Sequence, residues 1–79
     1  MIWEWHIPDL YQESVAELAK HNHPLFETMR KLQKTESGQL PHIFEIYPNV
    51  FLWRQYGYRI IYERIREQRL LLLATIQKM

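Results

Sequence analysis

The first segment of the chain alternates between apolar and polar residues, which is the pattern of a β-strand with one buried face. In the run IWEWHI of residues 2–7, both tryptophans share one side with Ile7, whereas Glu4 and His6 lie on the other. Pro8 follows directly and removes a backbone donor, so we expect the strand to end there. The pattern predicts a short strand whose tryptophan side packs on the core.

Residues 10–20 carry apolar side chains at the three- and four-residue spacing of an amphipathic helix. We expect Asp9 to cap the N-terminus of this helix, and Gln12 three residues later completes a capping-box pattern. The sequence HNH at residues 21–23 then interrupts the periodicity. The side chains predicted to face the core are Tyr11, Val15 and Leu18.

A second helix is predicted to begin at Pro24, because proline favours the first helical turn, where its missing N–H costs nothing. Its apolar stripe contains Leu25, Met29 and Leu32, with Phe26 beside it. Its last turns are basic, which favours the negative C-terminal end of the helix dipole. The basic residues are Arg30, Lys31 and Lys34. Two short helices adjacent in sequence fit a helical hairpin laid over a sheet.

The part of the chain after Pro41 is predicted to be extended. The predicted segments are 42–47 (a short strand or an extended lead-in), 50–55, 58–65 and 69–77, with turns between them at 48–49, 56–57 and 66–68. The last segment, RLLLLATIQ, is apolar on both faces, as expected for a central strand with helices on one side.

The predicted fold class is therefore α+β, with a helical hairpin packed on a small, mostly antiparallel sheet. The order of elements is β-α-α-β-β-β, which ends in an antiparallel meander of three or four strands. We expect the first strand to insert beside the last one.

Tyr56 and Gly57 fit a two-residue hairpin loop, which would place Arg54 directly opposite Arg59 on one face. Like charges that face each other in a sheet are unfavourable by about a few tenths of a kcal/mol. Two neighbouring guanidinium groups can instead clamp a phosphate through paired, charge-assisted hydrogen bonds. They can also stabilise charge that develops on a phosphoryl group in a transition state. A three-residue loop is the alternative, and it would leave both arginines solvated beside unlike partners.

Aromatic residues surround the two arginines, and unpaired bases stack on such rings. Trp53 and Tyr62 share one face and are expected in the core, whereas Tyr56 at the turn is expected to be exposed. His6 and His42 are candidates for acid–base catalysis if the fold brings either one near the arginines.

A metal site is not expected from the remaining histidines. His21 and His23 lie two residues apart at the helix break, with no cysteine in the chain and no obvious third ligand. The chain has only two glycines and no glycine-rich phosphate loop, so we expect no bound cofactor.

Composition limits the class of protein further. With 79 residues, the chain is expected to be one domain over residues 1–79. A hydrophobic fraction of 47% argues against disorder. The absence of cysteine suits a reducing cytosol. The N-terminus lacks the basic region of a signal peptide, and the longest apolar run, residues 70–74, is far shorter than a membrane helix. We therefore expect a cytoplasmic protein without membrane contact.

Charge is distributed unevenly along the chain. Residues 1–53 hold four basic and seven acidic residues, whereas residues 54–79 hold six basic and two acidic ones. A basic patch on a nearly neutral protein can bind phosphates locally. The alternative is that the charges at the strand ends are simply solvated.

The segment WRQYGYRIIYERI, together with the later RLLLLATIQK, resembles the RelE/ParE superfamily of toxins from bacterial type II toxin–antitoxin systems. Members typically show a strand that ends in Arg, a tight Gly turn, a Tyr-Arg pair before β-branched residues and Tyr, and an apolar last strand followed by basic residues. The corresponding residues here are Arg54, Gly57, Tyr58 to Tyr62, Leu70 to Ile76 and Lys78. The predicted order of elements matches the superfamily fold, and the motif-like part is confined to residues 53–62.

The resemblance implies one of two activities. RelE-like members enter the ribosomal A site and cleave messenger RNA, where basic residues hold the phosphate that the ribose 2′-OH attacks. ParE-like members bind DNA gyrase and cleave nothing. Members of both kinds are silenced by an antitoxin whose peptide wraps the toxin. We expect a ribosome-dependent endoribonuclease that blocks translation; the alternatives are a gyrase inhibitor, an inactive relic that binds only its antitoxin, or a small interaction domain.

The resemblance also implies roles for individual residues. Arg54 and Arg59 would clamp the phosphate, and Lys78 would be a supporting cation. Many ribosome-dependent members are more basic and carry a catalytic Tyr or His in a C-terminal tail, which this chain does not show. The catalytic acid or base is therefore either missing or an unusual residue, for which Tyr56 and His42 are the candidates. The basic end of the second helix (Arg30, Lys31 and Lys34) would contact RNA on the ribosome.

Overall fold

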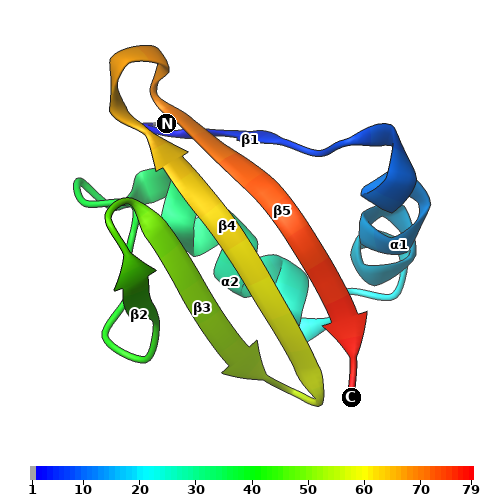
Figure 1. Cartoon of the computed structure of the whole chain (residues 1–79). Coiled ribbons are helices and arrows are strands. Elements are labelled where there is room, and N and C mark those ends of the chain that lie inside the picture. The colour runs from blue at the N-terminus through cyan, green and yellow to red at the C-terminus, as the bar shows by residue number, and fades with distance from the viewer. Residues whose placement is uncertain (1) are drawn as a thin grey trace.

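The structure is a computed structural model, and it describes residues 2–79. It has an α+β fold in which two helices pack on a five-stranded mixed sheet (Figure 1). The elements are strands β1 (Glu4–His6), β2 (Phe44–Tyr47), β3 (Val50–Gln55), β4 (Tyr58–Ile65) and β5 (Leu70–Lys78), helices α1 (Asp9–Lys20) and α2 (Pro24–Lys34), and a 3-10 turn, η1 (Arg66–Gln68). The predicted α+β class is thereby confirmed.

The strands are arranged in the order β1-β5-β4-β3-β2. β1 is parallel to β5, and the other four strands form an antiparallel meander. The first strand thus lies beside the last one, as predicted. The prediction that the last strand is central needs correction, because β4 occupies the middle of the sheet and β1 pairs only with Leu70–Leu72 of β5.

The start of α1 differs from the prediction. Pro8 occupies the N-cap position, and no side chain caps the helix. Asp9 is already inside the first turn, so its carboxylate acts only through the helix dipole. The Gln12 side chain donates instead to the carbonyl of Ile7, at 3.3 Å. Because the Pro8 carbonyl accepts from the backbone N–H of Tyr11, the helix begins one residue earlier than the capping-box pattern indicates.

Helix α2 begins at Pro24, as predicted, and His23 is its N-cap. The Nδ1 atom of His23 accepts a hydrogen bond from the backbone N–H of Leu25, at 3.1 Å. This bond satisfies one of the free amide groups that every helix N-terminus leaves. His23 therefore has a structural role in the helix cap. The buried residues of α2 are Leu25, Thr28, Met29 and Leu32.

The face of the sheet that packs on the helices holds the core. Phe51 and Trp53 of β3, with Ile60 and Tyr62 of β4, are almost completely buried. The Tyr62 hydroxyl donates to the carbonyl of Gly38, at 2.8 Å, so its buried polar atom is satisfied. The helices leave the opposite face of the sheet uncovered (Figure 1).

Candidate functional site

The turn between β3 and β4 contains two residues with positive φ, Tyr56 (φ 53°) and Gly57 (φ 79°). A type I′ hairpin turn requires positive φ at both central residues, and its twist matches that of the flanking strands. The pairing register places Gln55 opposite Tyr58. The two-residue loop is thus confirmed, and the alternative of a three-residue loop is wrong.

Arg54 is paired directly with Arg59 in this register. Their neighbours Trp53 and Ile60 are buried toward the helices, and side chains alternate along a strand. Both arginines therefore project from the uncovered face, where residues paired across two strands have Cβ atoms about 5 Å apart. Within residues 2–79, no carboxylate lies within 4.0 Å of either guanidinium group.

The side chain of Arg59 is held by a neutral partner. Arg59 and Gln77 are paired across β4 and β5, and Nη2 of Arg59 donates to Oε1 of Gln77. The Nε atom of Arg59 is buried and finds no acceptor among the described residues. A glutamine orients the guanidinium group without neutralising it, so the positive charge remains available to an anion.

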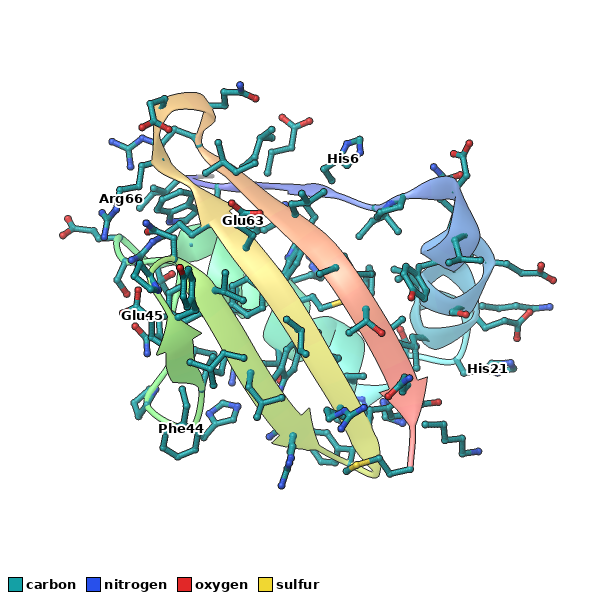
Figure 2. All side chains as sticks on the ribbon, in the orientation of Figure 1. His6, His21, Phe44, Glu45, Glu63 and Arg66 are labelled. Carbon is teal, nitrogen blue, oxygen red and sulfur yellow. The ribbon has the colours of Figure 1, made fainter. Side chains whose placement is uncertain are left out.

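A recess of about 190 Å³ opens beside Arg54, lined by His42, Phe44 and Leu52 in addition. It exists because β2 pairs with β3 only from Val50 to Leu52, which leaves the edge of the following residues without a strand partner among the described residues. Phe44 is 67% exposed and lies at the edge of the molecule (Figure 2). The recess thus combines a cation, an imidazole and an exposed aromatic ring.

His42 lies at the open edge of β3. Its Nε2 atom is 3.2 Å from Oε1 of Gln55, and its ring is edge-on to the indole of Trp53 with the centroids 6.4 Å apart. The sequence made His42 a candidate for acid–base catalysis if the fold brought it near the arginines, and His42 does line the same recess as Arg54. His6 lies far from the recess, because it belongs to β1, the strand at the opposite edge of the sheet, where it pairs with Leu72 (Figure 2).

Tyr56 is exposed, as predicted, but its ring lies on the helix side of the hairpin. The ring is edge-on to His23, with the centroids 5.9 Å apart, and Tyr58 contacts the same imidazole. Arg54 and Arg59 project from the other face. The structure consequently groups Tyr56 with the cap of α2 and does not bring its ring to the arginine pair.

The predicted RNA-binding residues do not form one surface with the arginine pair. Arg30, Lys31 and Lys34 belong to α2, which lies behind the sheet when the uncovered face is viewed (Figure 1). Arg30 also forms an exposed ion pair with Glu27, at 3.6 Å. Lys78 is in register with Tyr58 and lines a separate cleft of about 450 Å³ beside α1. The sheet itself separates these cations from Arg54 and Arg59.

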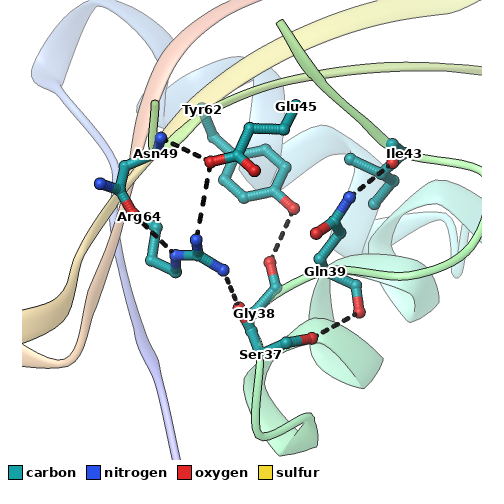
Figure 3. A network of polar contacts seen from close by, with 8 residues as sticks. All are labelled: Ser37, Gly38, Gln39, Ile43, Glu45, Asn49, Tyr62 and Arg64. Carbon is teal, nitrogen blue, oxygen red and sulfur yellow. Dashed lines mark hydrogen bonds and ion pairs between the residues drawn. The ribbon is translucent and has the colours of Figure 1, made fainter. Parts of the chain in front are cut away.

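Sequence reasoning missed Arg64, which is almost completely buried. Its guanidinium group donates to the Ser37 carbonyl at 2.5 Å and to Oδ1 of Asn49 at 3.1 Å, and it lies 3.7 Å from the Glu45 carboxylate (Figure 3). Burial lowers the pKa of Arg64, and the nearby Arg66 lowers it further, whereas Glu45 raises it. Arg64 thus connects β4 to the loops that contain Ser37 and Asn49. The sequence signal for its burial was its position two residues after Tyr62, which places both side chains on the same face of the strand.

Comparison of the chain with protein-family models, with curated proteins and with solved structures found no match. Within residues 2–79, no group of three or more histidine or acidic side chains is arranged to hold a metal ion. None of the helices in the same part of the chain is long and apolar enough to cross a membrane.

Proposed function

We propose that this chain is a RelE-like toxin of a type II toxin–antitoxin pair, and that it cleaves messenger RNA on the ribosome. The proposal rests on one observation. Arg54 and Arg59 are paired across the hairpin without a compensating carboxylate among the described residues, and His42 lines the recess beside Arg54. The resemblance in residues 53–62 supports the same conclusion. The cognate antitoxin and a cytoplasmic location are part of this proposal.

The arginine pair would bind the scissile phosphate. Two guanidinium groups can donate to the non-bridging oxygens and stabilise the extra negative charge of the phosphorane-like transition state. The exposed ring of Phe44 offers a surface on which an unpaired base can stack. Arg54 and Phe44 line the same recess, so the phosphate and an unpaired nucleobase would be held close to each other.

The reaction would be an internal transesterification. The ribose 2′ oxygen attacks phosphorus, and the bond from phosphorus to the 5′ oxygen breaks. The products are a 2′,3′-cyclic phosphate and a free 5′-hydroxyl end. A base, for which His42 is the candidate in the recess, takes the 2′-OH proton, and the leaving oxygen takes a proton from water.

Controlled expression in bacteria tests the proposal. Induction of this chain alone should arrest growth, and co-expression of the protein encoded next to it should restore growth. Primer extension on cellular messenger RNA should show new 5′ ends in translated regions. Normal growth at a high level of folded protein would contradict any toxin function.

A ParE-like function, inhibition of DNA gyrase without catalysis, is the second candidate. It is favoured by β2, where Phe44, Ile46 and Tyr47 are 67%, 52% and 71% exposed. Exposed clusters of large apolar residues often mark sites of protein binding. Growth arrest with intact messenger RNA, together with loss of supercoiling by purified gyrase, would support this function over the first.

A further inference from the structure

The amide of Gln55 has an orientation that its neighbours determine. The indole Nε1 of Trp53 is 2.8 Å from the Gln55 amide atom assigned as Oε1. An indole N–H can only donate, so the atom that receives it must be the oxygen of the amide. Trp53 is completely buried, which fixes this donor in place. From α2, the Thr28 hydroxyl approaches the same oxygen at 3.5 Å.

This orientation fixes the tautomer of His42. Nε2 of His42 is 3.2 Å from the same Gln55 oxygen, which has no hydrogen to donate. The hydrogen of this bond must therefore belong to Nε2. In the neutral ring the other nitrogen, Nδ1, then carries a free lone pair. A histidine in this tautomer can accept a proton only at Nδ1.

We propose that Gln55 is a positioning residue that holds His42 as the Nε2–H tautomer, and that Nδ1 is the general base of RNA cleavage. The inference rests on the proposed nuclease function. Nδ1 takes the proton of the ribose 2′-OH as the 2′ oxygen attacks phosphorus, and His42 becomes an imidazolium. Gln55 keeps its hydrogen bond to Nε2–H in both states of the ring.

The surroundings of His42 suit this role. Arg54 from β3 is the charged residue among those that line the recess, and it would hold the phosphate next to the ring. Phe44 from β2 and Leu52 from β3 supply apolar walls. Thr28 from α2, which reaches the Gln55 oxygen, carries no charge. The base and the phosphate-binding cation thus enter one recess from neighbouring segments.

Two variants of Gln55 separate positioning from simple packing. Gln55→Leu removes the acceptor, so His42 should become a mixture of tautomers and cleavage should slow by about tenfold to a hundredfold. Gln55→Glu keeps the acceptor for Trp53 and His42 but adds a negative charge that favours the imidazolium. The acid limb of the pH–rate profile should then move to higher pH by about one unit.

The readouts are side-chain ¹H–¹⁵N correlation spectra of the free protein and single-turnover cleavage of messenger RNA on programmed ribosomes. We expect the Nε2–H tautomer in the parent, and His42→Ala should cleave about a hundredfold more slowly. An Nδ1–H tautomer in the parent would overturn the positioning role of Gln55. Unchanged cleavage by His42→Ala would overturn only the role of His42 as the general base. A parent that shows the expected tautomer but never cleaves RNA would instead refute the proposed function, and the catalytic role with it.

Discussion

Arg54 and Arg59 face each other across the β3–β4 hairpin, and no carboxylate of residues 2–79 lies within 4.0 Å of either one. An opposed pair of like charges destabilises a sheet by about 0.2–1 kcal/mol. Because Gln77 orients Arg59 without neutralising it, the arrangement preserves positive charge at a fixed position. Such an arrangement is suited to an anion, and it yields the first prediction.

Replacing either arginine with alanine should abolish toxicity without unfolding the protein. Removal of one like charge relieves repulsion, so the free energy of unfolding should stay level or rise slightly. The cleavage rate should fall by about tenfold to a thousandfold, as is typical when one donor to a transition-state oxyanion is lost. The double variant should be little worse than either single one, because residues that act as a unit are not additive.

Arg66→Ala is the matched control, because it also removes one exposed positive charge but lies at the opposite end of β4 (Figure 2). It should retain full toxicity. Equal losses in Arg66→Ala and Arg54→Ala would mean that net charge, and not the arginine pair, matters. A lower urea midpoint of Arg54→Ala or Arg59→Ala than of the parent would mean that the arginines stabilise the fold.

Gln77→Glu should separate the orientation of Arg59 from its charge. The new carboxylate would still accept the hydrogen bond from Arg59 but would form an ion pair with it, and such a pair at the surface adds at most about 1 kcal/mol of stability. The cleavage rate should nevertheless fall, because the guanidinium group is neutralised. A variant that is as active as the parent would show that Arg59 does not meet the substrate.

Arg64→Ala should destabilise the protein by about 2–4 kcal/mol, since it removes a buried side chain and leaves two partly buried acceptors without their donor. The acceptors are the Ser37 carbonyl and the Asn49 side chain. Arg30→Ala is the control, because its exposed ion pair with Glu27 contributes only about 0.3–0.5 kcal/mol. Urea unfolding of the two variants measures the difference. Similar midpoints would show that the Arg64 network contributes little.

Burial raises the pKa of Tyr62 above the ordinary value for tyrosine, and Arg64 partly opposes this shift. The folded protein then keeps its proton at a pH where the unfolded chain loses it. The stability that Tyr62 contributes is complete below about pH 10 and is lost as the pH rises above it, by up to about 1.4 kcal/mol per pH unit.

Tyr62→Phe tests this linkage because it removes the ionisable group and keeps the ring. At neutral pH it should cost about 1 kcal/mol through loss of the hydrogen bond to the Gly38 carbonyl. Above pH 10 the gap between parent and variant should narrow, and guanidinium unfolding at several pH values measures it. A gap that stays constant up to pH 12 would contradict the shift.

Amide exchange should be slowest in β4, because β3 and β5 both pair with it from Tyr58 to Glu63. Exchange should be faster beyond Leu72 in β5, where β1 no longer pairs with that strand. It should be fastest of all in β2, a short edge strand with exposed residues. Mass spectrometry on peptic fragments provides the measurement, and protection of β2 beyond that of β4 would contradict the strand order.

The sequence alone determined most of the local structure. Alternation in residues 2–7 and the helical spacing before Lys34 predicted the first three elements, because these periodicities follow from backbone geometry. The turn at Tyr56-Gly57 predicted the register of the hairpin, since a two-residue loop permits one pairing. The opposed arginines followed from that register without any knowledge of the fold.

The tertiary structure decided which residues meet. Helix α2 packs behind the sheet, so the sheet separates its basic end from Arg54 and Arg59. The positive charge of these residues can be read from the sequence, but their separation cannot. His42 and Arg54 line one recess because β2 stops pairing at Leu52, and the length of an edge strand depends on contacts distant in sequence. The direction of a side chain on a strand follows from the local backbone, whereas the packing of helices on a sheet depends on contacts between distant parts of the chain. For that reason the arginine pair could be predicted, and the recess that completes the site could not.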